Sequence, residues 1–259
     1  MNSNNVQQTS MHPGTLVVDW NSYAQCYDLL CTLNPAYAAL QNEFRAFCNS
    51  IDLRPGARIL DLGGGTGNFF CQALPIQIAR SAELMHLDFD SEMNAIAEKK
   101  YRQHGLSVEL VKREASKAVL PAGSIDCILS INALYAMPNQ ASVLSRAFHW
   151  LRPGGYLFLI DLGRIQNTND WTKFLVKSNA REIGVLQILK ILLNEGMVIS
   201  KANRKITLAQ RNGTYWKHTK EELCAILKQI GFNVLQSREV YRGYSDLAIA
   251  RKPAPSAIH

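Results

Sequence analysis

The feature that most constrains the fold is a run of glycines directly after a short apolar segment. Residues 58–62 read Arg-Ile-Leu-Asp-Leu, and Gly63, Gly65 and Gly67 follow. A strand that enters a glycine turn and then a helix brings its backbone close to a ligand at the carboxyl edge of a parallel sheet. The spacing is not the GxGxxG of a dinucleotide site, since position 68 is Asn. The loop therefore predicts a tight turn around a ligand that has a carboxylate and an ammonium. Asp61 is placed to face the ammonium.

Beyond residue 55 the chain alternates between short apolar segments and longer amphipathic ones. The short segments predict strands and the longer ones predict helices. Strands separated by single helices pair in parallel with right-handed crossovers, so this alternation predicts an open doubly wound sheet. Strands are expected at 58–62, 84–89, 108–111, 125–131 and 156–161, helices at 66–79, 91–104 and 140–151, and a turn at 152–155.

The last part of the chain adds a helix and two strands. Thr219 and Glu222 have the spacing of a capping box, and Gly231 follows the apolar stripe of the helix as a C-cap. The strands expected at 234–241 and 246–251 form an antiparallel pair. The predicted fold class is α/β: a doubly wound Rossmann-like sheet of seven strands with an antiparallel last strand, plus a helical cap insert.

The positive charge of the chain is concentrated in one segment. Residues 164–217 hold ten Lys or Arg against three Asp or Glu, and this difference equals the net charge of +7 of the whole chain. The rest of the chain is therefore neutral. An insert of this length is too long for a plain loop and predicts helices. Within it, residues 183–193 are strongly apolar but too short to cross a bilayer.

A series of short motifs, in order along the predicted strands and turns, carries a resemblance to a known family. With these motifs the chain resembles the class I S-adenosylmethionine-dependent methyltransferases of the small-molecule type. The resemblance covers residues 20–163 well and residues 219–252 more loosely. The motifs are Asp61-Leu-Gly63-Gly-Gly65-Thr-Gly67, Leu87-Asp88, Arg113-Glu114-Ala115, Ser124-Ile-Asp126, Ser130-Ile-Asn132-Ala133-Leu134 and Leu151-Arg-Pro153-Gly154-Gly155.

The resemblance implies an enzyme that transfers a methyl group from S-adenosyl-L-methionine to a small molecule and releases S-adenosyl-L-homocysteine. Asp88 holds the place of the acid that binds the ribose hydroxyls in that family. Glu114 holds the place of the acid that faces the adenine amino group, and it is longer than the more usual Asp. The cofactor-binding residues expected from the resemblance are Asp61, Gly63, Gly65, Gly67, Asp88, Phe89, Glu114, Ala115, Asn132 and Tyr23.

The same resemblance divides the chain into five parts. The N-terminal helices are expected to break near Asn34-Pro35, where the proline disfavours a helical residue before it. The parts are a flexible arm at 1–16, N-terminal helices over the site at 17–54, an S-adenosylmethionine-binding core at 55–163, a basic helical cap at 164–218 and the C-terminal part of the core at 219–259.

Tyr27, Tyr135 and His218 are the residues expected in the acceptor pocket. Tyr23 and Tyr27 share a helix face, where they either attract the sulfonium or only pack the helix onto the sheet. Tyr135 follows the fourth strand, at whose end ligands bind in such sheets. His218 is the histidine considered as a base, against the alternative of a histidine without a chemical role. Methyl transfer mostly needs alignment and exclusion of water, so no catalytic triad is required.

The apolar run and the cations of the cap together favour an amphipathic acceptor with an anionic group. Peripheral contact with a membrane and a homodimer through the cap are the alternatives for the same surface. A nucleic-acid base methyltransferase and a non-catalytic methyltransferase-like binding subunit stay open as other functions. Nucleic acid is disfavoured because Ala133 and Leu134 replace the prolines of the Asn/Asp-Pro-Pro-Tyr motif of such enzymes, and no stacking platform is visible.

The cysteines and the first residues bear on the cellular location. The six cysteines lack the CxxC spacing of zinc and redox sites, which predicts no metal and a reducing compartment. Residues 1–10 lack the basic and apolar regions of a signal peptide. We therefore expect a cytoplasmic protein.

Overall fold

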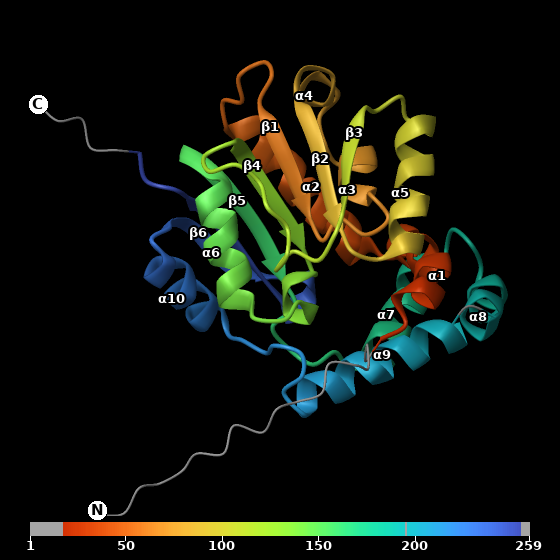
Figure 1. Cartoon of the computed structure of the whole chain (residues 1–259). Helices are drawn as coiled ribbons and strands as arrows, with labels where there is room; N and C mark the ends of the chain where they lie inside the picture. Colours follow the sequence, from red (N-terminus) through yellow and green to blue (C-terminus); the bar gives the residue numbers. More distant parts are fainter. Residues whose placement is uncertain (1–17, 195, 255–259) are drawn as a thin grey trace, which may run out of the picture.

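A seven-stranded sheet with helices on both faces organises the chain (Figure 1). The computed structural model describes residues 18–194 and 196–254, and the arm expected at 1–16 lies outside them. The strand order is β3-β2-β1-β4-β5-β7-β6, and β7 runs antiparallel to both of its neighbours. This arrangement confirms the predicted fold class. The strands are β1 (Arg58–Leu62), β2 (Glu83–Asp88), β3 (Val108–Lys112), β4 (Ile125–Ile131), β5 (Leu151–Asp161), β6 (Asn233–Val240) and β7 (Ser245–Arg251).

Side-chain caps define where several helices begin. Asn34 accepts a hydrogen bond from the backbone N–H of Ala36, and Asp90 accepts one from Met93. Thr219 and Glu222 form the predicted capping box. The helices are α1 (Trp20–Leu33), α2 (Pro35–Ser50), α3 (Asn68–Gln72), α4 (Ile76–Ser81), α5 (Ser91–Gln103), α6 (Gln140–Trp150), α7 (Thr168–Asn179), α8 (Val185–Asn194), α9 (Gly196–Arg211) and α10 (Lys220–Ile230), with short 3-10 turns η1 (Leu134–Ala136) and η2 (Tyr241–Gly243).

Two expected elements differ from the structure. The single helix expected at 66–79 is two short helices, α3 and α4, which separate at Pro75. Proline lacks a backbone N–H and disfavours a helical residue before it, so the first helix cannot continue. The turn expected at 152–155 is part of β5, which begins at Leu151 and pairs with β4 across a register shift. The bulge absorbs the extra residues and lets the strand continue.

The two faces of the sheet bury separate apolar cores. Alternate residues of each strand point to opposite faces, so Ile59 and Leu60 enter different cores. One core lies under α6 and α10, and the other lies under α2, α3 and α5. The sheet is therefore a rigid support for the loops at its carboxyl edge.

The insert forms three helices, α7, α8 and α9, which lie with α1 beyond the carboxyl ends of the parallel strands (Figure 1). A third apolar cluster joins α1 and α9 to the strand ends, and we call it the subcap cluster. α8 leaves Val185 and Leu186 exposed. Within the described residues, none of the helices combines the length and the hydrophobicity needed to span a membrane. The buried members of the subcap cluster are Val18, Tyr23, Ala24, Met93, Tyr135, Leu162, Ala202, Ile206, Ala209 and Tyr215.

Candidate functional site

The glycine loop between β1 and α3 presents backbone at the carboxyl edge of the sheet. Gly63, Gly65 and Gly67 have φ values of +74°, +54° and +76°, which favour glycine. A Cβ at Gly63 would lie 2.6 Å from the Cβ of Ala133, beside the end of β4. At Gly65 the nearest neighbour of a Cβ would be Met93 Sδ, at 3.8 Å. The loop is therefore tightly packed at Gly63, against Ala133, and open at Gly65, where a ligand can approach the backbone.

Asp88 ends β2 and faces this loop. Its Oδ2 accepts the backbone N–H of Gly65 at 2.9 Å, and its Oδ1 accepts that of Asp90 at 2.9 Å. Burial raises the pKa of Asp88, although these hydrogen bonds act in the opposite direction. Each carboxylate oxygen can accept more than one hydrogen bond. The carboxylate is thus oriented and still able to accept the two hydroxyls of a ribose.

Asp61 is buried in β1 beneath the loop and lacks a counter-cation among the described residues. Burial, and then the charge of Asp88, raise the pKa of its carboxyl to about 8. Its register partner in β2 is His86, whose pKa is lowered by burial to about 4, so that imidazole is neutral. Two neighbouring acids with no cation favour a positively charged ligand, because a cation would offset the cost of ionising Asp61.

The residues expected around the adenine lie at the ends of β2 and β3. The ring of Phe89 is 46% exposed next to Asp88, while Ala115 is buried. Glu114 is half-buried, and its carboxylate pairs with the ammonium of Lys117 at 2.9 Å. Glu114 would have to share its carboxylate between Lys117 and an adenine amino group.

Asn132 follows β4 in a left-handed conformation, with φ of +48°. Its backbone N–H donates to the carbonyl of Ile160 at 2.6 Å, and its side-chain oxygen accepts the hydroxyl of Ser245 at 2.9 Å. The side chain is therefore bound to the start of β7. Asn132 shapes the turn that leads to Tyr135.

The expected aromatic residues meet in and beside the subcap cluster. Tyr23 packs against Trp20 and Tyr27, with ring centroids 5.8 and 5.5 Å apart. Tyr135 meets Tyr215 edge to face at 5.5 Å. Burial raises the pKa of Tyr23, Tyr27 and Tyr135, so their hydroxyls are neutral at physiological pH. These rings contribute apolar surface at the strand ends but do not act as bases.

One contact on α1 was missed by the sequence reasoning. Asp28 Oδ1 accepts hydrogen bonds from Thr66 Oγ1 at 2.6 Å and Asn68 Nδ2 at 3.0 Å, and Oδ2 pairs with Lys100 Nζ at 2.9 Å. Thr66 and Asn68 belong to the glycine loop and the start of α3. Asp28 thus ties α1 to the loop. A carboxylate on the buried side of an amphipathic helix is the signal that could have indicated such a partner.

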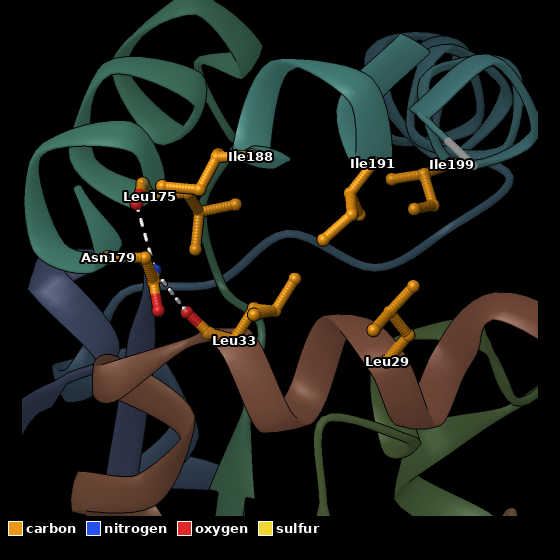
Figure 2. Close-up of a pocket in the computed structure, with 7 residues that line it drawn as sticks. All are labelled: Leu29, Leu33, Leu175, Asn179, Ile188, Ile191 and Ile199. Carbon is orange, nitrogen blue, oxygen red and sulfur yellow. Dashed lines mark hydrogen bonds between the residues drawn. The ribbon is translucent and has the colours of Figure 1, made fainter. Parts of the chain in front are cut away.

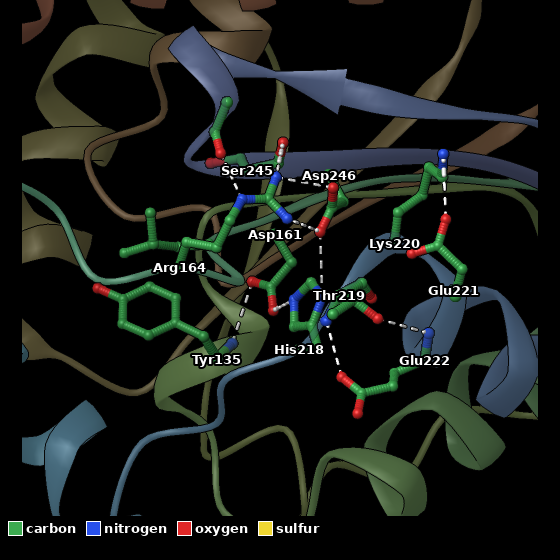
Figure 3. Close-up of polar contacts among 12 residues, drawn as sticks. Tyr135, Asp161, Arg164, His218, Thr219, Lys220, Glu221, Glu222, Ser245 and Asp246 are labelled. Atoms are coloured by element: carbon green, nitrogen blue, oxygen red, sulfur yellow. Dashed lines mark hydrogen bonds and ion pairs between the residues drawn. The ribbon is translucent and has the colours of Figure 1, made fainter.

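His218 lies at the end of the cap, away from the glycine loop. Its imidazole is fully buried between Asp161 and Asp246, two acids that the sequence reasoning did not select (Figure 3). Asp161 ends β5, and Asp246 lies inside the apolar strand β7. Acids in such positions are almost never fully buried unless they are paired, which is the signal that could have identified them.

The structure thus brings part of the expected site together. Asp61, Asp88 and the glycine loop lie side by side at the carboxyl edge of β1 and β2. Tyr23 and Tyr135 share the subcap cluster. His218 belongs to a separate group of buried charges. The glycine loop with Asp61 and Asp88 offers a diol acceptor, a cation acceptor and open backbone, and the subcap cluster offers apolar side chains at the strand ends.

Comparisons with known sequences agree with this arrangement. A family profile described as a methyltransferase domain matches residues 36–237. The ubiquinone/menaquinone biosynthesis C-methyltransferase of Erwinia tasmaniensis is 27% identical over 150 residues, which cover 57% of this chain and 59% of that protein. The corresponding protein of Vibrio cholerae is 28% identical over 148 residues, or 56% of each chain. The chain thus spans less than two thirds of the length of these relatives.

Comparison with solved structures identifies the same fold. An S-adenosylmethionine-dependent methyltransferase from Aquifex aeolicus superimposes with a TM-score of 0.58 at 18% identity, over 90% of this chain and 98% of that one. A geranyl diphosphate methyltransferase, solved with GPP and sinefungin, superimposes with a TM-score of 0.56 at 11% identity, over 83% of this chain and 77% of that one. At these identities the likeness establishes the fold alone.

Proposed function

This chain belongs to the class I S-adenosylmethionine-dependent methyltransferases, and on that basis we propose that it methylates a small amphipathic molecule with an apolar body and an anionic group. S-adenosylmethionine, the cofactor of this family, supplies a methyl group on a sulfonium. A nucleophilic atom of the acceptor bonds to this methyl carbon as its bond to sulfur breaks, and S-adenosylhomocysteine leaves. The part of the protein is to align the two molecules and to exclude water.

We assign the cofactor contacts to the edge formed by β1, β2 and the glycine loop. The oriented carboxylate of Asp88 would accept the ribose hydroxyls, and Asp61 would face the ammonium. The open backbone at Gly65 would allow the cofactor to approach closely. The fit is supported by the raised pKa of Asp61, since a carboxyl that burial keeps protonated gains most from a cationic ligand.

The acceptor body would lie in apolar surroundings between the core and the cap. Figure 2 shows a narrow apolar pocket between α1 and the cap helices, in which Ile188 and Ile191 come from the apolar run predicted at 183–193. Its polar member, Asn179, donates its amide to the carbonyls of Leu33 and Leu175 at 2.8 Å each. The lining is therefore hydrocarbon, but a volume of about 10 Å³ has room for about one water, so the pocket marks apolar packing between α1 and the cap and does not by itself hold the acceptor. Its remaining lining residues are Leu29 and Ile199.

The observation that carries the proposal is the positive charge of the cap, which also supplies these apolar groups. Arg164 is paired with Asp246, and Asp170 is paired with Arg242. Most other cations of the cap are exposed or half-exposed and have no ion pair among the described residues. They can raise the local concentration of an anionic acceptor. They are Lys177, Arg181, Lys190, Lys201, Arg204, Lys205, Arg211 and Lys217.

Geranyl diphosphate and geraniol provide a matched test of this acceptor class. They share a hydrocarbon chain, and only the first carries an anionic group. The full chain is incubated with S-adenosylmethionine and each compound, and release of S-adenosylhomocysteine is measured. We expect the diphosphate to be methylated at least about ten-fold faster at low concentration, which corresponds to about 1.4 kcal/mol of added binding. Equal turnover of geraniol, preference for geranylamine, or no turnover of the diphosphate would contradict the proposal.

A further inference from the structure

The cap leaves the core and returns to it at one place. Gly163 precedes the cap, and the backbone N–H of His218 donates to its carbonyl at 3.1 Å. A Cβ at Gly163 would lie 2.3 Å from the carbonyl oxygen of His218, so this close approach requires glycine. The N–H of Arg164 donates to the carbonyl of Tyr244 at 3.2 Å. Both ends of the cap are therefore held against the core by backbone hydrogen bonds.

The imidazole of His218 joins two carboxylates from different strands (Figure 3). Nε2 lies 3.2 Å from Asp161 Oδ2, and Nδ1 lies 3.3 Å from Asp246 Oδ2. All three side chains are fully buried. Nδ1 also lies 3.3 Å from the carbonyl oxygen of Thr219, so each ring nitrogen faces only acceptors. A neutral imidazole has one N–H and leaves its other nitrogen facing acceptors without a proton, whereas an imidazolium carries a proton on both sides.

The charges around His218 balance only when it is protonated. Arg164 is the second cation, and its guanidinium donates to both oxygens of Asp246, at 2.8 and 2.9 Å. A neutral His218 would leave one buried carboxylate in excess, which is costly away from water. Burial by itself lowers the pKa of His218, but the hydrogen bonds and charges of Asp161 and Asp246 raise it to about 9.

The other charged groups near these acids belong to the start of α10 and to β6, where the exposed Glu239 is the register partner of Asp246. Lys220 pairs with Glu221 at 3.2 Å, and Glu222 accepts the backbone N–H of Thr219 at 2.8 Å. The ring of Trp216 covers the imidazole, with centroids 4.3 Å apart. Glu221, Glu222 and Glu239 are exposed to solvent, so the balance among the buried groups depends on His218.

The same group of charges holds Tyr135. Asp161 Oδ1 accepts the backbone N–H of Tyr135 at 3.0 Å. The N–H of Trp216, two residues before His218, donates to the carbonyl of Tyr135 at 2.9 Å. The backbone of Tyr135 is thus fixed on both sides by groups tied to His218. Its ring lies in the subcap cluster and meets the ring of Tyr215, and Tyr135 is one of the residues that the sequence predicts in the acceptor pocket.

We propose that His218, as an imidazolium between Asp161 and Asp246, is a positioning residue that holds both ends of the cap and the backbone of Tyr135 in the arrangement used for methyl transfer. The reaction it serves rests on the proposed function, but the arrangement itself can be measured without an acceptor. In this role His218 is a cation at neutral pH and not the base considered from the sequence.

The protonation state can be tested by NMR of the full chain labelled with ¹⁵N-histidine. The signals of His218 are identified by their loss in His218→Gln, and His149→Gln is the control that removes a histidine outside the charge group. We expect both ring nitrogens of His218 to be protonated at pH 7.5 and to titrate near pH 9. A neutral imidazole at pH 7.5 would overturn the proposal.

The positioning role can be tested by amide hydrogen exchange. In His218→Gln the amides of Tyr135 and Trp216 should exchange at least ten-fold faster, while the Kd of S-adenosylhomocysteine changes by less than three-fold. The double variant His218→Gln with Asp161→Asn removes one cation and one carboxylate, and keeps an oxygen for the Tyr135 N–H. It should recover most of the lost protection.

The outcomes separate this proposal from the proposed function. Unchanged exchange in His218→Gln, or equal loss in the single and double variants, would refute the positioning role. If His218→Gln does not fold, the positioning role is tested in the wild-type protein. The protection of the Tyr135 amide against hydrogen exchange, corrected for the intrinsic pH dependence of exchange, must then fall between pH 8 and pH 10. Failure of the wild type to bind S-adenosylhomocysteine would count against the proposed function alone, since the exchange and NMR measurements do not need a ligand.

Discussion

The carboxylate of Asp28 in α1 lies 2.9 Å from the ammonium of Lys100 in α5, and it also accepts hydrogen bonds from the glycine loop region. Lys100 is 14% exposed and Asp28 is 37% exposed, so the pair is partly shielded from water. α1 carries Tyr23 and Tyr27. The position of these rings over the strand ends therefore depends on a contact with the loop expected to bind the cofactor.

Removing this contact should weaken cofactor binding. In Asp28→Asn the ion pair is lost while the size of the side chain is kept, and α1 should open more readily. A charge-assisted hydrogen bond that is partly exposed contributes about 1 kcal/mol, which corresponds to a roughly five-fold weaker affinity. Calorimetry with S-adenosylhomocysteine measures the effect. Arg102→Gln, which removes an exposed pair with Glu98, is the control and should leave the affinity unchanged.

Asp88→Ala should weaken the binding of S-adenosylmethionine by at least about 1.5 kcal/mol, or about ten-fold, because the carboxylate is proposed to accept both ribose hydroxyls. The same calorimetric titration measures this loss. Asp52→Ala, at an exposed position far from the loop, is the matched control. An affinity of Asp88→Ala equal to that of the control would exclude Asp88 from the ribose site.

Binding of S-adenosylhomocysteine at pH 7 should release most of one proton. The pKa of Asp61 is raised to about 8 by burial and by Asp88, so the carboxyl is mainly protonated before binding. The ammonium of the ligand favours the ionised form and displaces the proton. Calorimetry in buffers of different ionisation enthalpy counts the protons released. The release should vanish in Asp61→Asn, and an unchanged release there would assign the proton to another group.

The stability of the protein should fall at alkaline pH through His218. Its pKa is raised from 6.5 to about 9 in the folded state. The stabilisation is therefore fully present below pH 6.5, and it is lost as the pH rises through 9. Urea unfolding of the wild type and of His218→Gln should show the wild type losing more free energy of unfolding between pH 8 and pH 10. Parallel curves would show that His218 does not titrate in this range.

Reversing two charges of the cap should affect the acceptor and not the cofactor. In Arg204→Glu with Lys205→Glu, the KM for geranyl diphosphate should rise at least about five-fold at low salt, and the difference should shrink as salt shortens the screening length of about 10 Å. The affinity for S-adenosylmethionine should stay within about two-fold, since the core is neutral. Lys99→Glu with Lys228→Glu makes the same change in net charge outside the cap. An equal effect of both pairs would indicate a response to net charge alone.

Several local features follow from the residues next to them in the chain. The glycine turn after β1 and the capping box at Thr219 are where the sequence predicted them. Each depends on hydrogen bonds or backbone angles within a few residues. Two expectations were wrong. A helix was expected across Pro75, where the residue type itself opposes one, and a turn was expected at 152–155, where the extra residues form a bulge of β5 against β4.

The sequence by itself determined the parallel sheet, the loop at its carboxyl edge and the acid at the end of β2, because periodicity and turn chemistry act over short distances along the chain. Only the tertiary structure decided the contacts made across long separations. Asp28 meets Lys100 across 72 residues, and Asp161 meets His218 across 57. A buried charge must have a partner, but its own sequence neighbourhood does not say which one. The choice is made when α1 and the cap pack against the strand ends.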